Sequence, residues 1–209
     1  MKYAPARGPG HRTGCDARAP PSSLYPVTDL TDEQIVDAVL AGDPNAFAVL
    51  VSRYTARYAR FAVRMLGNRE DGEEALQDAF VRAYRSLDKR DRKSAFASWF
   101  HSILLNQCRT TARRRANRLR LLVHDEVALE RAVADHAPPV ASEGSEIEAA
   151  IGKLDPSQRE VFLMKYVEDM SYDEIAEVTG VGVSALKMRV KRTADRLREM
   201  MGEVPHETG

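Results

Sequence analysis

The fold is decided by residues 155–201, which read DPSQREVFLMKYVEDMSYDEIAEVTGVGVSALKMRVKRTADRLREMM. Ser171 and Glu174 have the spacing of a capping box, and Gly180 marks the end of the helix that they begin. After a short turn, the next helix has one apolar face and a largely basic opposite face. The apolar positions are Leu186, Val190, Ala194, Leu197 and Met201, and the basic ones are Lys187, Arg189, Lys191, Arg192, Arg196 and Arg198. This pattern predicts a helix-turn-helix with a cationic second helix.

A cationic helix of this kind fits the major groove of DNA. Side chains near its N-terminus meet base edges, while the other cations meet phosphates. DNA is therefore the first partner that the sequence predicts.

The charge of the chain is segregated along its length. The formal net charge of the 209 residues is zero, which taken alone argues against a nucleic-acid-binding protein. However, residues 109–120 hold six basic residues and no acidic one, whereas residues 124–148 hold seven acidic residues against the single Arg131. Basic and acidic surfaces are thus expected to alternate along the chain.

The N-terminal half shows only helical spacing. Thr31 and Gln34 form a second capping-box pattern, and Asp43-Pro44 begins a helix that Gly67 ends. A third helix is expected at about residues 69–87, with Ala83, Tyr84 and Leu87 among its inward-facing residues, and a fourth from near Ser94 into the basic run 113–115. Since no segment alternates with a period of two for long enough to make a strand, we expect an all-α protein.

Several classes of site and protein are disfavoured by composition. Cys15 and Cys108 are too few and too far apart for a disulfide framework, which favours a reducing cytoplasm. Cys108 lies on a predicted helix with apolar neighbours, so we expect an inert buried thiol. The histidines are scattered, so we expect no metal and no other cofactor. No apolar run approaches the roughly 20 residues that cross a bilayer, so no membrane insertion is expected. A glycine-rich phosphate loop, a nucleophile elbow and a clustered acid and base are all missing, so we expect neither an enzyme nor a small-molecule substrate.

Two exposed faces of the predicted bundle differ in charge. The third helix carries Glu70, Asp71, Glu73, Glu74, Gln77 and Asp78, and the fourth carries Arg109, Arg113, Arg114, Arg115 and Arg118. Helix dipoles explain part of both clusters, but the dense cationic end also suits a phosphate backbone. The loop at residues 88–96 combines cations with nearby aromatic rings, as in proteins that hold single strands. Phe96 and Trp99 fit either that role or the core.

Two motif blocks together resemble a known family. The blocks NREDGEEALQDAFVRAYRSL (residues 68–87) and SAFASWFHSILLNQCRTTARRR (94–115), an acidic linker and the helix-turn-helix look like bacterial sigma factors of the extracytoplasmic-function group. The resemblance covers residues 32–201. It implies a polymerase-docking domain at 29–118 and a promoter-reading domain at 145–202, joined by a flexible acidic linker at 119–144. Tails at 1–28 and 203–209 are expected to be disordered.

The resemblance also implies roles for particular residues. Docking on core RNA polymerase would involve Glu73, Glu74, Gln77, Asp78 and Arg82. Capture of the non-template strand of the −10 element would involve Arg92, Lys93, Ser94, Phe96, Trp99, Asn106, Arg109 and Arg113. Contacts with the −35 element would involve Ser184, Lys187, Met188, Arg189, Lys191, Arg192 and Arg196. Many relatives are held by an anti-sigma factor, so this partner is expected as well.

Two departures from the family pattern affect these expectations. Gly72 interrupts the third helix near its start, which suggests locally adaptable docking, and Gly182 stands where many relatives have a hydroxyl cap. A stand-alone helix-turn-helix regulator with a ligand-sensing bundle is the alternative function. The acidic face and the basic, aromatic loop favour the initiation factor.

Overall fold

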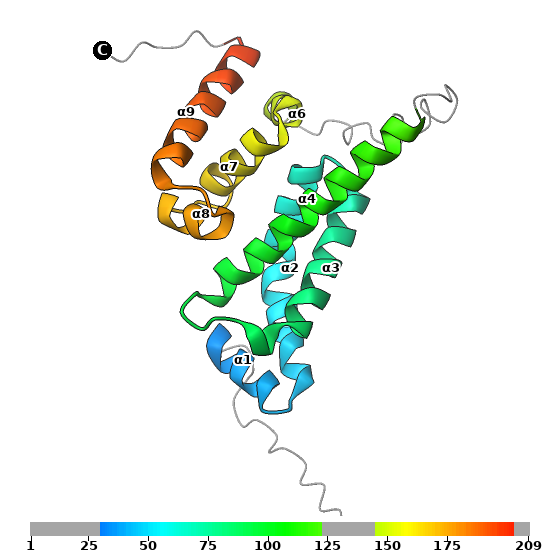
Figure 1. Ribbon diagram of the computed structural model, residues 1–209, viewed down its shortest axis with the longest axis vertical. Helices are drawn as coiled ribbons and strands as arrows, with labels where there is room; N and C mark the ends of the chain where they lie inside the picture. Colours follow the sequence, from blue (N-terminus) through cyan, green and yellow to red (C-terminus); the bar gives the residue numbers. More distant parts are fainter. Residues whose placement is uncertain (1–29, 123–144, 203–209) are drawn as a thin grey trace, which may run out of the picture.

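The computed structural model describes residues 30–122 and 145–202, and every regular element within these two ranges is helical (Figure 1). The all-α class predicted from the sequence is therefore confirmed. The predicted tails and most of the predicted linker lie outside the described residues. We call residues 30–122 the first unit and residues 145–202 the second unit.

The first unit is a bundle in which α2, α3 and α4 pack on one another and α1 lies across one end (Figure 1). Its elements are α1 (Asp32–Leu40), the 3-10 helix η2 (Pro44–Ala46), α2 (Phe47–Leu66), α3 (Arg69–Arg85), the 3-10 helix η3 (Leu87–Lys89) and α4 (Phe96–Leu122). The capping box of α1 is present, because Gln34 N donates to Thr31 Oγ1 at 3.3 Å and Thr31 N donates to Gln34 Oε1 at 2.8 Å. Gly67 ends α2 in the left-handed conformation, with φ of 68°.

The core of the first unit is rich in aromatic rings. Phe80 and Phe100 stack with centroids 4.5 Å apart, and Phe61 and Phe96 are fully buried as well. Tyr84, which helical spacing placed in the core, instead is 45% exposed and meets Phe47 edge-on at 5.2 Å. Sequence periodicity gave the buried face of α3 correctly up to Ala83, but it did not show where the neighbouring helix stops covering that face.

Gly72 lies in α3 where this helix crosses α2. A Cβ built on Gly72 would lie 2.8 Å from the backbone N of Val63 and 2.9 Å from its Cα. Optimal contact between carbon atoms begins near 3.5 Å. The glycine therefore permits the close approach of two helices, and it is buried rather than a point of local adaptability.

The second unit holds the helix-turn-helix. Its elements are α6 (Ser145–Lys153), α7 (Pro156–Tyr166), α8 (Tyr172–Thr179) and α9 (Val183–Met200). The predicted capping box is present, since Glu174 N donates to Ser171 Oγ and Ser171 N donates to Glu174 Oε2. Gly180 ends α8 with φ of 71°, and α9 packs on α7 and α8 through Leu186 and Val190.

The two units pack against each other. α6 and α7 lie on α2, and α8 lies on α4 (Figure 1). Arg159 of α7 donates to the backbone carbonyl of Met65 in α2 at 2.9 Å. The buried apolar residues of both units form one continuous cluster.

Helix α4 is the longest described element, with 27 residues, and it runs four residues beyond the boundary expected at residue 118. Its C-terminal half is dense in arginine and has no Gly or Pro to stop it. In the described ranges, no helix combines the length and apolar character required to cross a bilayer.

Candidate nucleic-acid interface

Helix α9, the second helix of the helix-turn-helix, presents its polar face to solvent. Gly182 caps its N-terminus without a side-chain hydrogen bond. Of the predicted −35 contacts, Arg189 is half-buried and the others are exposed: Ser184, Lys187, Met188, Lys191, Arg192 and Arg196. The Lys187 ammonium lies 5.7 Å from the ring centroid of Tyr172, the first residue of α8, so the two helices of the motif also touch through a cation–π contact.

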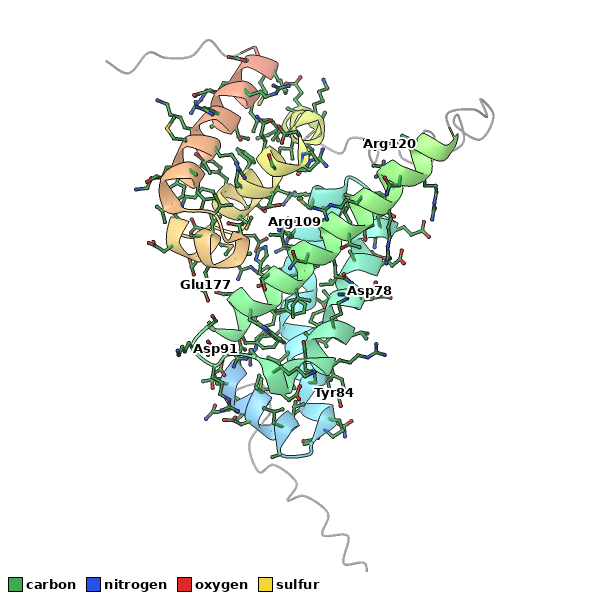
Figure 2. All side chains as sticks on the ribbon, in the orientation of Figure 1. Asp78, Tyr84, Asp91, Arg109, Arg120 and Glu177 are labelled. Atoms are coloured by element: carbon green, nitrogen blue, oxygen red, sulfur yellow. The ribbon has the colours of Figure 1, made fainter. Side chains whose placement is uncertain are left out.

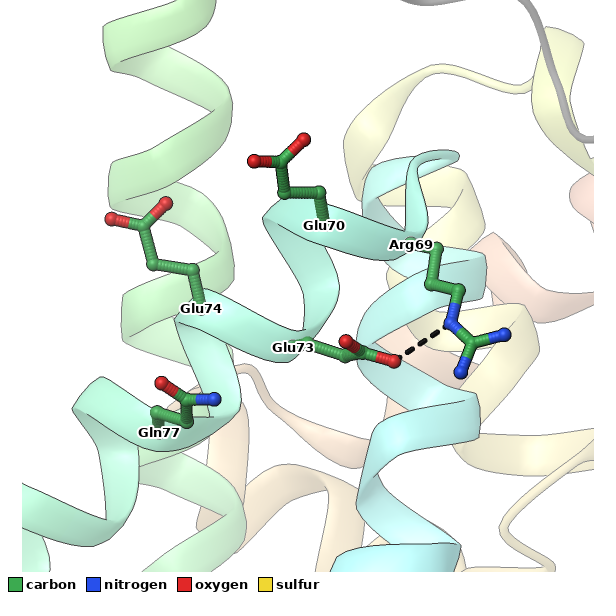
Figure 3. A pocket seen from close by; sticks show the side chains of 5 residues that line it. All are labelled: Arg69, Glu70, Glu73, Glu74 and Gln77. Atoms are coloured by element: carbon green, nitrogen blue, oxygen red, sulfur yellow. Dashed lines mark hydrogen bonds and ion pairs between the residues drawn. The ribbon is translucent and has the colours of Figure 1, made fainter.

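The outer face of α3 carries a shallow pocket (Figure 3), lined by Arg69, Glu70, Glu73, Glu74 and Gln77. Arg69 Nε donates to Glu73 Oε1 at 2.8 Å, which leaves Glu70 and Glu74 to give the pocket its negative charge. All five predicted polymerase contacts on this helix, from Glu73 to Arg82, are exposed.

Two apolar residues follow the acidic pocket along α3. Val81 is 47% exposed and Tyr84 is 45% exposed, so this helix offers an apolar strip beside its carboxylates. Fully buried interface cores are typically apolar and aromatic within a polar rim. Sequence reasoning missed both residues, since it placed Tyr84 in the core and gave Val81 no role.

The loop between η3 and α4 is held by α1. The side chain of Arg90 is 1% exposed, pairs with Glu33 of α1 and donates to the carbonyl of Ser94 at 2.5 Å. Arg92 pairs with Asp37, one turn further along α1, at 2.5 Å. These contacts fix the loop that carries Arg92, Lys93 and Ser94 among the predicted −10 residues.

The aromatic residues predicted for strand capture lie at different depths. Phe96 is 1% exposed and packs on Tyr54 and Phe100 at 5.7 and 5.9 Å between ring centroids. It is therefore a core residue, and in this conformation its ring cannot stack on a base. Trp99 is partly buried and packs on Phe96, with 5.8 Å between centroids, so part of this residue remains accessible.

The cationic part of α4 is divided between the surface and the second unit. Arg113 is exposed, as is Asn106, whose Oδ1 accepts from Arg109 Nη1 at 3.4 Å. Arg109 points at α7 (Figure 2), where its guanidinium binds both carboxylate oxygens of Glu160 at 3.0 and 2.7 Å. This pairing, across 51 residues of sequence, was not predicted.

The strongly shifted titratable groups of the first unit are buried in its core. Burial, with a smaller contribution from Arg57, lowers the pKa of His101 to about 3, and burial raises the pKa of the Cys108 thiol to about 12. Cys108 is thus an inert buried thiol, as predicted. Within residues 30–122 and 145–202, no three acidic, His or Cys side chains cluster as a metal site would require.

Comparison with known proteins agrees with this geometry. Two family models match the chain, "Sigma-70 region 2" over residues 50–118 and "Sigma-70, region 4" over residues 145–197. The sigma factor CnrH of Cupriavidus metallidurans is 31% identical over 180 residues, which cover 81% of this chain and 94% of CnrH. The ECF sigma factor SigW of Bacillus subtilis is 27% identical over 179 residues, or 81% of this chain and 96% of SigW.

The chain belongs to the extracytoplasmic-function group of sigma-70 family sigma factors. A solved structure, of CnrH in complex with the cytosolic domain of CnrY, has the same fold, with a TM-score of 0.60 at 29% identity over 82% of this chain and 97% of that one. The sigma factor RpoE of Bartonella quintana, solved with the anti-sigma factor NepR, shares the fold with a TM-score of 0.61 at 20% identity over 75% of this chain.

The region matches of this sigma factor correspond to its two units. Region 4 extends from the start of α6 into α9, and region 2 begins at residue 50, within α2. Helix α1 lies outside both matches, although its Glu33 and Asp37 hold the loop before α4. The sequence signal for this role was weak, because a few carboxylates on a nine-residue helix are also what any solvated helix carries.

Proposed function

We propose that this sigma factor divides promoter recognition between its two units, with α3 and the loop before α4 acting in the first unit and α9 in the second. The observation that carries the proposal is that both units match sigma regions, in order, while their cationic elements remain largely exposed. As an initiation factor, the protein directs core RNA polymerase to promoters.

Docking on core polymerase is assigned to the exposed face of α3. Glu73, Glu74, Gln77, Asp78 and Arg82 supply its polar contacts, and the adjacent Val81 and Tyr84 supply apolar area. Asp78 accepts a hydrogen bond from Gln107 Nε2 at 3.3 Å, so the helix is supported from α4 behind it. A few contacts in such a surface carry most of its binding free energy.

Strand capture at the −10 element is assigned to the loop after η3 and to α4. Lys93 and Arg113 are exposed cations, and exposed Asn106 and partly buried Trp99 lie on the helix between them. Arg92 and Arg109 join this set only when they leave Asp37 and Glu160. Stacking of an unpaired base typically contributes about 1–3 kcal/mol, which offsets part of the cost of opening the duplex.

Reading of the −35 element is assigned to α9 in the major groove. Lys187, Met188, Lys191 and Arg192 face the bases, and Arg189 and Arg196 contact phosphates, with Ser184 near the N-terminus of the helix. CnrH was solved with the cytosolic domain of CnrY, and we propose that this chain also binds a regulatory partner of the anti-sigma type. We further propose that it acts in the cytoplasm, without a cofactor and without catalysis of its own.

The proposal is tested by run-off transcription with purified core polymerase on a promoter library, with and without the protein. Initiation at specific sites only when both are present supports it. Site-specific DNA binding by the protein alone, with no effect on initiation, would indicate the stand-alone regulator instead.

The docking face is tested by the Gln77→Ala/Asp78→Asn double variant. We expect the affinity for core polymerase to fall at least about ten-fold. Glu199→Gln, which removes one charge from the far end of α9, is the control and should bind core like the wild type. Equal affinity of all three proteins would remove α3 from the docking face.

Alanine at Lys187 or Arg192 should lower initiation at the cognate promoter, since one base contact is worth about 1–3 kcal/mol.

A further inference from the structure

The ion pairs between the two units share one polarity. In the described part of the chain, three ion pairs join the units, and in each the arginine belongs to the first unit and the carboxylate to the second. The pairs are Arg57–Glu168 at 2.5 Å, Arg64–Glu148 at 2.9 Å and Arg109–Glu160 at 2.7 Å. The first unit thus presents three guanidinium groups to the second unit, which pairs each of them with a carboxylate.

In two of these pairs the glutamate is much more buried than the arginine. The side chains of Glu168 and Glu160 are 3% and 6% exposed, whereas those of Arg57 and Arg109 are 44% and 35% exposed. A buried carboxylate without its partner is strongly unfavourable, so the two glutamates depend on the arginines. The arginines, which keep contact with water, depend much less on the glutamates.

The three arginines have the chemistry of a phosphate site. A guanidinium donates two parallel hydrogen bonds to a carboxylate or to a phosphate with nearly the same geometry. Arg109 already holds Glu160 in this two-pronged way, and Arg57 binds both the Glu168 carboxylate and the Glu168 carbonyl. Arg57 and Arg64 are seven residues apart on α2, two turns along the same face.

The packed arrangement is too short to engage both promoter elements at once. Elements centred at −10 and −35 are about 25 base pairs apart, which is about 85 Å at about 3.4 Å per base pair. Helix α4, which carries −10 candidates, has 27 residues, or about 40 Å, and helix α9 has 18 residues, or about 27 Å, at about 1.5 Å per residue. Their units pack directly on each other, and even end to end these two helices would fall short of about 85 Å. The units must therefore separate during initiation, and separation exposes Arg57, Arg64 and Arg109.

We propose that Arg57, Arg64 and Arg109 form a single phosphate-binding face, covered in the free protein by Glu168, Glu148 and Glu160 and occupied by the promoter DNA backbone after the units separate. This inference rests on the proposed function. The three carboxylates compete with DNA phosphates for the arginines, so the free protein binds DNA weakly. When the two units separate on the polymerase, the arginines become available for new DNA contacts in the same step.

The experiment measures binding of the full-length protein, without polymerase, to a fluorescein-labelled 30-nucleotide single strand and to its duplex. The Glu160→Gln/Glu168→Gln variant keeps the shape of the side chains and removes their charge. We expect it to bind DNA on the order of ten-fold more tightly, because the fraction of molecules with an uncovered face rises. Glu146→Gln/Glu199→Gln removes the same charge from exposed positions of the second unit and should change the affinity much less.

A second pair of substitutions identifies the face itself. Adding Arg57→Gln and Arg64→Gln to the uncovered variant should reverse the gain. It should also reduce the slope of log affinity against log salt by about 1.4 for the single strand, at about 0.7 per phosphate contact. Small-angle X-ray scattering on the same samples reports whether the units have separated, and circular dichroism reports that the helices are intact.

Two results would overturn the inference. One is a variant that scattering shows to be open but that binds DNA no better than the charge-matched control. The other is scattering that shows the two units still packed together both in Glu160→Gln/Glu168→Gln and in the charge reversal Glu148→Arg/Glu168→Arg. The ion pairs would then not be what holds the second unit on the first. Loss of specific initiation in the run-off assay would refute the proposed function separately, since these binding measurements contain no polymerase.

Discussion

Replacing Gly72 by alanine has two opposite effects on the free energy of unfolding, and the packing around this residue decides which is larger. In an exposed helix, alanine is favoured over glycine by about 1 kcal/mol. At Gly72, however, the new methyl group would lie 2.8 Å from the Val63 backbone N and 2.9 Å from Val63 Cα and Cγ2. These distances are about 0.6–0.7 Å shorter than an optimal contact of about 3.5 Å.

The clash at Gly72 is with backbone, which a rotamer change cannot relieve. α2 and α3 must move apart, which disturbs the most extensive helix pair of the bundle. Overpacking of this kind costs about 1–3 kcal/mol, occasionally more. We therefore expect Gly72→Ala to lower the free energy of unfolding by up to about 2 kcal/mol after the gain in helix propensity is subtracted.

Urea unfolding followed by circular dichroism measures this change, and Gly152→Ala provides the matched control. Gly152 lies near the end of α6, and its added Cβ would meet nothing within 4 Å. The control should be neutral or stabilised by up to about 1 kcal/mol. If Gly72→Ala is more stable than the wild type, as a glycine in open space would be, the close contact of α2 and α3 at this residue is wrong.

Two further predictions concern buried charge. Glu33→Gln removes the counter-ion of buried Arg90, so we expect it to reduce opening of the −10 region several-fold, measured by permanganate reactivity, without loss of core binding. Asp37→Asn, which breaks the exposed Arg92–Asp37 pair, is the control. Equal effects of the two substitutions would contradict the role of Glu33. The lowered pKa of His101 means that only the unfolded chain takes up this proton between about pH 6.5 and pH 3, so stability falls as pH falls through this window. His101→Leu should therefore lose about 2 kcal/mol less stability than the wild type between pH 7.5 and pH 5, measured by urea unfolding, and parallel losses would refute it.

The boundaries of many elements followed from local sequence. The capping boxes at Thr31 and Ser171 and the left-handed glycines Gly67 and Gly180 fall at the helix ends where they were predicted. Their success has a simple cause, because a cap satisfies backbone groups within one turn and depends on residues three or four positions apart. The same local rules did not anticipate that α4 continues to Leu122.

The positions of single side chains depended on helices that are distant in sequence. Helical spacing left Phe96 undecided between the core and strand capture, and it wrongly placed Tyr84 in the core. Both outcomes depend on packing, because an apolar face is buried only where another helix covers it. The order of motifs did predict which helices carry the candidate sites. It did not show that the loop before α4 is fastened by α1, since that contact joins residues 57 positions apart.

The sequence by itself determined the helical class, the helix-turn-helix and the family, because periodicity, caps and motif order are written in neighbouring residues. The tertiary structure alone decided that Gly72 is a point of close helix contact, that Phe96 is core and that Arg109 binds Glu160. The physical reason is range: hydrogen bonds of a helix close within four residues, whereas burial and charge pairing depend on which surfaces the packed helices bring together.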